Sequence, residues 1–321
     1  MSIQNASASL YGTKLFGRQL NLAIGFPSDP GADKVLTAWN DKNAEGVSTG
    51  GIGGLRVDYV VNKSLKNTTP STADIKVYNF NPAHRKALSG AQKLSVKLEV
   101  GYEGGVTQIY FAEARSAWTK REGPDFITHV ESTDTIARPT GEKTITAAAG
   151  AKLGSKSSNL YRTTGAKVPL KDAFAALTAS MGIGDGNLKE ALNNLRGSRV
   201  TGVQGAALIG NAQQRMTDIC RSAGLEWSIQ DGNLQLVNIG QVLSTTQAIV
   251  VSADTGMVEE PAVDSQGAVT FKMLTVPGLI PGCLVNFQTL FIDGGYRVEQ
   301  VRYEGSTHGN AWYAECTAVK Y

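Results

Sequence analysis

The chain has 321 residues with 41% hydrophobic and 18% charged side chains, and its net charge is only +3. This length exceeds the size at which a single hydrophobic core stops growing, so the sequence predicts two or three domains. The composition excludes a disordered chain, and the small charge excludes a nucleic-acid-binding role argued from bulk charge alone.

The first part of the chain is predicted to form strands. Short apolar runs alternate there with polar, glycine-rich breaks, at 55–61, 75–80, 94–102 and 106–111. In Leu94–Tyr102 the apolar residues recur at every second position, which indicates one buried and one wet face. The break at 103–105 predicts a hairpin, and a turn at 122–124 predicts that 114–119 pairs with 126–132.

The middle of the chain has a helical period instead. After the weakly patterned segment 140–167, apolar residues follow Pro169 at helical spacing as far as Gly182, and Pro169 is interpreted as the first helical residue. Shorter helices are predicted at 188–195, ending before Gly197, and at 211–224, beginning at the N-cap Asn211. The runs 225–229 and 234–237 then predict a hairpin around Asp231-Gly232.

The last part returns to strands, separated by turn residues at 277–278, 281–282, 293–295 and 305–309. The predicted strands are 248–252, 269–274, 283–287, 295–303 and 312–319. Residues 247–321 contain four basic and eight acidic residues, a net charge of −4, which leaves +7 for the rest of the chain. This segment is therefore predicted to be an acidic barrel or sandwich of about five strands.

The fold class expected from these patterns is mainly β with an α+β middle domain. Two β-barrel-like domains are expected to flank a small α+β domain. The predicted boundaries are 1–139 for the N-terminal domain, 140–246 for the middle domain and 247–321 for the C-terminal domain.

Several C-terminal motifs occur in an order that resembles the baseplate hub proteins of contractile-tailed bacteriophages, the late control protein D-like family. Ser252–Gly256 followed by Glu260-Pro261 resembles the connector of that family, and Gly278–Gly282 resembles its Pro-Gly turn. Gly294–Val301 and Gly305–Trp312 resemble its closing strand and hairpin. Other similar segments are Gly267–Leu274, Leu98–Tyr102 with 106–111, and the helices at 170–181 and 211–224 leading into Leu225-Glu226-Trp227. Ala112-Glu113 stands where the family often has glycine, and the first 50 residues match no motif of the family.

This resemblance implies a structural role without catalysis. Hub proteins of this kind form homotrimers in which two barrel domains per subunit make a pseudo-six-fold ring, adapting a six-fold tail tube to a three-fold spike. The expected partners are other copies of the chain, the tail spike protein, the tail tube or tube-initiator protein and baseplate wedge proteins. DNA is expected to pass through the channel without specific binding. The expected location is the tail baseplate of the virion, assembled in the host cytoplasm.

Candidate catalytic, cofactor and metal sites are each interpreted as absent. His84, His129 and His308 are isolated and lack metal-ligand spacing. The separated cysteines Cys220, Cys283 and Cys316 suggest neither a disulfide framework nor zinc, so a reducing compartment fits best. Neither a signal peptide nor a membrane span or anchor is expected.

Loop motifs also have simpler interpretations than catalysis or ligand binding. Gly46–Gly50 matches the Gly-x-Ser-x-Gly pattern of hydrolases without the strand and helix that such an elbow needs, and Gly50–Gly54 lacks the lysine of a phosphate loop. Gly184–Asn187 is interpreted as a turn instead of a calcium loop. Glu259-Glu260 lies in a predicted extended connector, where adjacent carboxylates point to opposite sides.

Three alternatives to a structural hub remain open from the residues. A peptidoglycan-cleaving tail enzyme would need paired carboxylates, whose separation the sequence does not define. Nucleic-acid binding would use the basic run from Lys143 to Lys167, interpreted as a solvated connector, or base stacking on Trp118, Trp227 and Trp312, interpreted as packing residues. Another structural protein of a non-contractile tail tip or tube is a third possibility.

Overall fold

The structure is a computed structural model that describes residues 15, 17–25, 35–40, 54–66, 69–89, 94–103, 105–134, 167–195, 202–204, 212–276 and 278–321. It is mainly β, with most of its helix in the middle of the chain, as predicted. Residues 1–134 and 241–321 form one compact unit and residues 135–240 form another. The division into three domains stays a prediction, because compactness alone does not define which parts fold independently.

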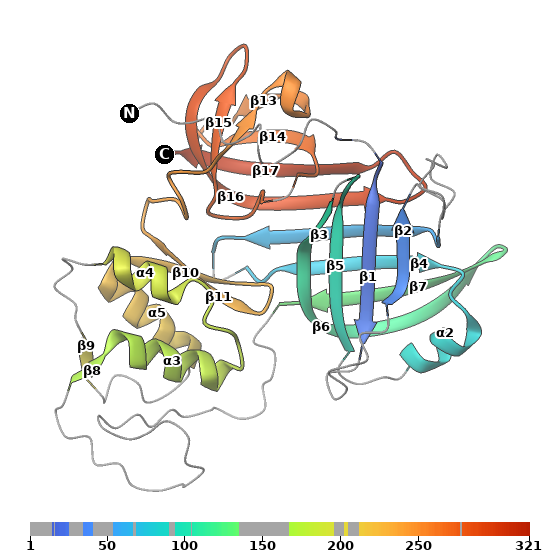
Figure 1. Cartoon of the computed structure of the whole chain (residues 1–321), viewed down its shortest axis with the longest axis horizontal. Coiled ribbons are helices and arrows are strands. Elements are labelled where there is room, and N and C mark those ends of the chain that lie inside the picture. The colour runs from blue at the N-terminus through green and yellow to red at the C-terminus, as the bar shows by residue number, and fades with distance from the viewer. Residues whose placement is uncertain are drawn as a thin grey trace, which may run out of the picture. The chain divides into compact units, whose positions relative to one another are not determined.

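The first unit is one large sheet to which both ends of the chain contribute. Its elements are β1 (Gln19–Gly25), β2 (Val35–Asn40), β3 (Val57–Ser64), β4 (Thr72–Tyr78), α2 (Pro82–Leu88), β5 (Leu94–Tyr102), β6 (Gly105–Glu122), β7 (Asp125–Thr133), β12 (Ala248–Val251), β13 (Met257–Val263), β14 (Val269–Leu274), β15 (Leu284–Gln288), β16 (Asp293–Ser306) and β17 (Trp312–Lys320). They pair in the order β13-β14-β17-β16-β3-β4-β7-β6-β5-β1-β2, and β12 joins β16 through β15 (Figure 1). No pairing among the described residues closes this sheet into a barrel.

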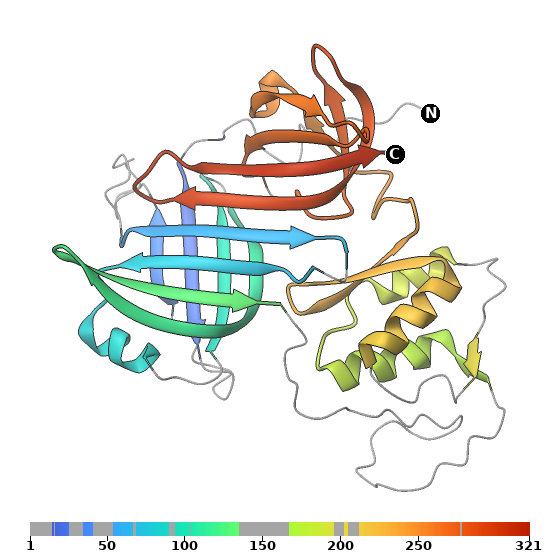
Figure 2. The same cartoon turned by 180° about the vertical axis from the view of Figure 1, so that it is seen from behind.

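The long strand β6 folds the sheet onto itself. Residues 105–114 of β6 pair with β5, whereas residues 114–122 pair with β7. Each pairing contains one register shift, opposite Leu98 and Glu99 of β5 and between Ala114 and Ser116 of β6. Bulges of this kind bend a strand while its hydrogen bonds to the neighbouring strand continue. Figures 1 and 2 show β5 and β1 crossing the layer of β3, β4 and β7. The predicted pairings of 94–102 with 106–111 and of 114–119 with 126–132 are confirmed, but the prediction of two separate strands is wrong because both segments belong to β6.

A seam between β3 and β16 joins the N-terminal and C-terminal strands. Residues 58–64 of β3 pair in register with 300–306 of β16. The ladder continues at one end with Leu65 N donating to Glu299 O at 2.8 Å, and at the other with Thr307 N donating to Val57 O at 3.0 Å. The two β-rich halves thus share one continuous sheet, whose described strand pairs are antiparallel except for β12 with β15.

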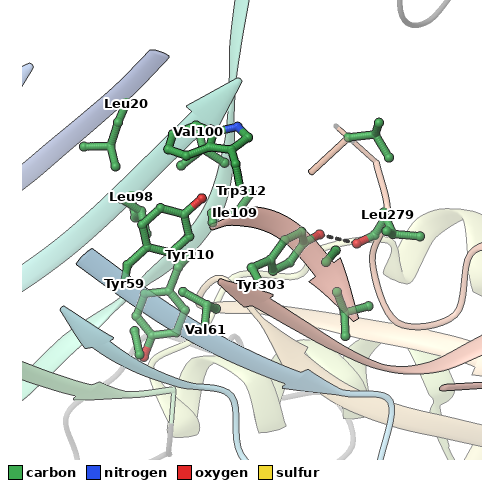
Figure 3. Close-up of a cluster of buried hydrophobic side chains, with 14 of the residues drawn as sticks. Leu20, Tyr59, Val61, Leu98, Val100, Ile109, Tyr110, Leu279, Tyr303 and Trp312 are labelled. Carbon is green, nitrogen blue, oxygen red and sulfur yellow. Dashed lines mark hydrogen bonds between the residues drawn. The ribbon is translucent and has the colours of Figure 1, made fainter. Parts of the chain in front are cut away.

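The hydrophobic core is shared across the seam as well. Every second side chain of β3 and β16 points inward, and a single buried cluster contains apolar residues from both halves. In Figure 3, Tyr59 and Val61 of β3 lie beside Tyr303 of β16 and Trp312 of β17. Tyr59 and Trp312 pack edge to face, with ring centroids 5.8 Å apart and planes at 78°.

Two other sequence interpretations in this unit are wrong. Met257–Val263, interpreted as a connector, is the edge strand β13, where Pro261 is tolerated because an edge residue needs no second ladder bond. Residues 293–295, interpreted as a turn, begin β16 and pair with β15. The sequence analysis did not predict β1, β2 or α2.

The second unit contains three helices, a hairpin and a short strand pair. Its elements are β8 (Lys167–Pro169), α3 (Leu170–Met181), α4 (Leu188–Asn194), β9 (Gly202–Gln204), α5 (Ala212–Ala223), β10 (Leu225–Gln230) and β11 (Asn233–Asn238). The helices and the β10–β11 hairpin bury one hydrophobic cluster that includes Phe174, Met216 and Trp227. The predicted α+β content of the middle segment is confirmed.

Local signals account for the boundaries of these elements. Gly182 ends α3 in the left-handed conformation at φ 71°, which glycine adopts without a Cβ penalty. The β10–β11 turn has positive φ at both Asp231 (55°) and Gly232 (75°), as the Asp-Gly signal predicts. Pro169 is the N-cap of α3 instead of its first residue, and the predicted stop at Gly197 lies outside the described residues.

Candidate assembly surfaces

The large sheet, in which β3 and β16 join the two halves, has one face that points away from the core. On this face several basic side chains form ion pairs with acidic side chains of the same strand. Arg56 pairs with Asp58 at 2.9 Å, Lys120 with Glu122 at 3.1 Å and Arg302 with Glu304 at 3.3 Å. In each pair the acidic residue follows the basic one by two positions, so both side chains leave the same side of one strand. Exposed pairs of this kind stabilise a fold by only about 0–1 kcal/mol each. Their consequence is a polar face whose charge is neutralised locally.

Asp58 also bonds across the seam. Ser306 Oγ on β16 donates to Asp58 Oδ1 at 2.6 Å, and Arg56 Nη2 donates to Asp58 Oδ2 at 2.9 Å. Burial raises the pKa of Asp58, but the hydrogen bonds from Arg56, Ser306 and Tyr78 outweigh it and hold this pKa below the ordinary value.

We expect acid to weaken the seam. The folded-state pKa of Asp58 lies below the unfolded value of about 3.9, so its stabilisation is complete above that value and is lost as the pH falls through the folded pKa. The Asp58→Asn variant should be less stable by about 1 kcal/mol at pH 7 and should lose less stability between pH 5 and pH 2. Urea unfolding at several pH values measures both effects, and parallel pH profiles for variant and parent would contradict them.

The sheet, which runs from β13 to β2, exposes two strand edges that a neighbouring chain can approach, on β13 and on part of β6. Among the described residues, β13 pairs only with β14, and residues 115–122 of β6 pair only with β7. Unpaired edges of this kind are where another chain can associate. On β13, Val258 and Val263 are 48% and 58% exposed, while Pro261 and two register shifts interrupt the regular edge.

Beside the exposed part of β6, two arginines meet one aromatic ring. Arg85 of α2 lies over the ring of Phe126, with Cζ 3.9 Å from the centroid, and Arg121 Cζ lies 5.6 Å from the same centroid. Arg121 Nε donates to Gly123 O at 3.2 Å, whereas Arg85 Nε is buried without a hydrogen-bond partner. No carboxylate in the described part of the chain forms an ion pair with either guanidinium.

The β15–β16 turn presents two apolar side chains to solvent. Leu290 and Phe291 are 81% and 82% exposed. Thr289 Oγ1 donates to Ile292 O at 2.9 Å and accepts from Ile292 N at 3.1 Å, and the buried Phe287 and Ile292 anchor the turn on either side. An apolar tip held this rigidly is suited to filling a pocket on a partner protein.

The Leu290→Ser/Phe291→Ser variant should therefore keep its stability and lose binding. The free energy of unfolding, measured by thermal unfolding, should change by less than about 0.5 kcal/mol because neither side chain is buried. Binding of the chain to a partner protein, measured by co-purification, should weaken severalfold. Ile292→Ser is the contrasting variant, since this side chain is 6% exposed and its replacement should cost about 2–3 kcal/mol. Unchanged partner binding by the tip variant would exclude the tip as a contact.

The three tryptophans considered for base stacking occupy different environments. Trp312 and Trp227 are 1% and 6% exposed and pack in the two cores. Trp118 is 40% exposed and stacks on His129, with ring centroids 5.1 Å apart and planes at 4°. The packing interpretation is confirmed for the first two, and Trp118 lies on the polar face of the β6–β7 hairpin.

The histidines and carboxylates form no reactive cluster in the described ranges. His84 packs against Phe80 at 6.1 Å, and His308 Nδ1 lies 2.9 Å from Thr307 Oγ1. No group of three His, Cys, Asp or Glu side chains in this part of the chain is placed to hold a metal ion. No helix in the same ranges is long and apolar enough to cross a membrane.

All three cysteines are free thiols. Burial raises the pKa of Cys220 and of Cys283 to about 12 each and raises that of Cys316 well above its ordinary value. Because the thiolate is the reactive form, we expect the folded protein to react with a disulfide reagent at pH 8 more than about 1,000-fold slower than the chain in urea. Rapid labelling of any native cysteine would contradict this.

Some predicted features lie outside the described residues. These are the serine motif at 46–50, the glycine run at 50–53 and the basic segment 143–166. Gly184–Asn187 does join α3 to α4 as a turn, with Gly186 at φ 52°. Sequence analysis did not identify the Arg85–Phe126–Arg121 contact, which only folding creates. It also passed over Leu290-Phe291, although two bulky apolar residues just before a turn-like Asp-Gly-Gly run were a visible signal.

Solved structures with this fold exist. A tail protein from Neisseria meningitidis MC58 matches with a TM-score of 0.54 at 11% identity, over 95% of this chain and 97% of that one. The chain has the fold of a known tail protein. A 43 kDa tail protein of prophage MuSo2 from Shewanella oneidensis matches with a TM-score of 0.53 at 9% identity, over 95% of this chain and 98% of that one. Comparisons with protein-family models and with curated proteins give no match.

Proposed function

We propose that the chain is a structural subunit of a phage tail, a homotrimeric baseplate hub that adapts the six-fold tail tube to the three-fold spike. The observation that carries this proposal is the seam between β3 and β16, which makes one sheet from two β-rich halves in a fold shared with known tail proteins. A trimer contains six such halves. It can therefore present six similar surfaces to a six-fold tube while keeping the three-fold symmetry of the spike.

The polar face of the sheet supports a channel that passes DNA without holding it. Binding of DNA depends on unneutralised basic side chains that displace counterions from phosphates. Arg56, Lys120 and Arg302 on this face are already paired with carboxylates. A lining of this kind offers a polyanion neither strong attraction nor strong repulsion.

The partners proposed for the ring are the spike on one side, the tube or tube-initiator on the other, and baseplate wedge proteins around it. The two β-barrel-like domains of the proposal correspond to the two halves of the large sheet. The proposed location is the tail baseplate, assembled in the host cytoplasm, and the proposed role includes no catalysis.

The mass of the purified chain, with and without its spike, tests this proposal. Light scattering should give three times the 34.0 kDa chain mass alone, and the mass of three chains plus one trimeric spike after mixing. A strict monomer that binds neither spike nor tube protein would contradict the hub.

Two other readouts separate the alternatives. A peptidoglycan-cleaving enzyme would clear a zymogram of cell-wall substrate, which we expect to stay blank. A protein that binds nucleic acid through residues 143–167 would slow the migration of DNA in a gel at low salt, and its affinity for DNA would fall steeply as the salt concentration rises. We expect no change in DNA migration.

A further inference from the structure

We infer that copies of this chain join head to tail, with the β13 edge of one copy seated on the Arg85–Phe126–Arg121 surface of the next. This inference rests on the proposed homotrimer and names the surfaces that hold it together.

The arginine surface is electrostatically incomplete in a single chain. Two guanidinium groups, from α2 and β6, approach one phenyl ring, and no described carboxylate balances either positive charge. The buried Nε of Arg85 has no acceptor, which costs free energy until one arrives. Arginine next to an aromatic ring is also the composition found at the energetic centre of protein interfaces. The missing element is a carboxylate.

Strand β13 has an exposed carboxylate next to exposed apolar side chains, which complements the arginines and the phenyl ring. Glu260 is exposed and forms no ion pair or hydrogen bond with other described residues, in contrast to Glu259, which pairs with Lys272 at 3.3 Å. Val258 and Val263 on the same strand are exposed apolar side chains that could cover the Phe126 ring. The charge balance agrees, since residues 247–321 carry −4 and the rest of the chain +7.

The surroundings of the arginines favour a single carboxylate over a nucleic acid. Glu122 and Asp125 lie on the same hairpin and would repel the successive phosphates of a polyanion. One carboxylate placed between Arg85 and Arg121 avoids most of that repulsion.

The geometry within the unit makes the contact heterologous. β13 is the last strand on one side of the sheet, and residues 115–122 of β6, between β7 and β5 in the strand order, expose a different edge, so each copy carries one of each surface. Unlike surfaces build a ring when the rotation between copies closes. Because Pro261 and the register shifts interrupt β13, the contact depends on side chains more than on a ladder of backbone hydrogen bonds.

Charge reversal tests the pairing in the full-length protein by sedimentation equilibrium. Arg85→Glu/Arg121→Glu and, separately, Glu260→Arg should each raise the dissociation constant of the trimer by on the order of 100-fold. The chain with all three changes should recover most of that loss, because the charges are exchanged across the same contact. Circular dichroism and thermal unfolding verify that every variant folds.

The matched controls lie on α4 in the other compact unit. Glu190→Lys makes the same change of charge as Glu260→Arg, and Lys189→Glu makes the change of one of the two arginine reversals, both at exposed positions; each should leave the dissociation constant within about twofold. Single reversals that leave the trimer intact, or a combined variant that stays dissociated while folded, would overturn the inference.

The outcomes also separate this inference from the proposed function. A stable parent trimer unaffected by the reversals rejects the contact and leaves the hub in place. If the parent chain is monomeric at all concentrations, both the contact and the trimer are rejected. An immunoblot of purified tails then decides whether the chain is a tail protein at all.

Discussion

Replacing Trp312 by alanine is expected to lower the free energy of unfolding of the β-rich unit by about 4 kcal/mol. Trp312 is 1% exposed and packs edge to face on Tyr59, so it connects β17 from the C-terminal half to β3 from the N-terminal half. Its removal leaves a large cavity at the seam that neighbouring strands cannot fill. Urea unfolding monitored by circular dichroism measures the loss.

Trp118→Ala is the matched control for this variant. Trp118 is 40% exposed and touches His129 on a polar face, so its removal should cost less than about 1 kcal/mol. Equal effects of the two substitutions would mean that Trp312 does not lie in a shared core.

Replacing Gly305 by alanine is the second change with a large expected effect, a loss of about 3 kcal/mol. Gly305 of β16 lies directly opposite Tyr59 of β3, and a Cβ at this position would overlap the Tyr59 ring. Either the ring leaves its place beside Trp312 or the two strands separate at the seam, and both outcomes destabilise the unit.

Gly295→Ala on the same strand provides the comparison. A Cβ there would meet Leu284 Cδ1 at 3.4 Å, an ordinary contact, so its stability should stay within about 1 kcal/mol of the parent. Combining Gly305→Ala with Tyr59→Leu should cost less than the sum of the single changes, since the smaller side chain removes the overlap. Additive losses in urea unfolding would show that the glycine is needed for another reason.

Local sequence signals account for much of the secondary structure. The alternation in Leu94–Tyr102 predicted strand β5 with the bounds that the structure has, and the spacing after Pro169 predicted helix α3 as far as Met181. The Asp231-Gly232 turn fixed the β10–β11 hairpin. In each case neighbours along the chain carry the information, through period, capping or turn geometry.

Long-range pairing accounts for what the sequence did not reveal. The sequence was divided into separate N-terminal and C-terminal β domains, so the pairing of β3 with β16 was not predicted. The two strands are more than 200 positions apart, and neither is unusual in composition. The same limit hid the Arg85–Phe126–Arg121 contact, which brings α2 onto the β6–β7 hairpin. Edge strand β13 was missed for a local reason, since Glu259, Glu260 and Pro261 suppress the strand signal at the position where an exposed edge tolerates them.

The position of the chain in an intact tail tests the central claim most directly. Immunogold labelling of purified tails should place a single cluster of label at the spike end of the tube, because a hub occurs once per tail. Label along the whole tube would identify a tube protein instead, and tails without label would contradict a structural role in the particle.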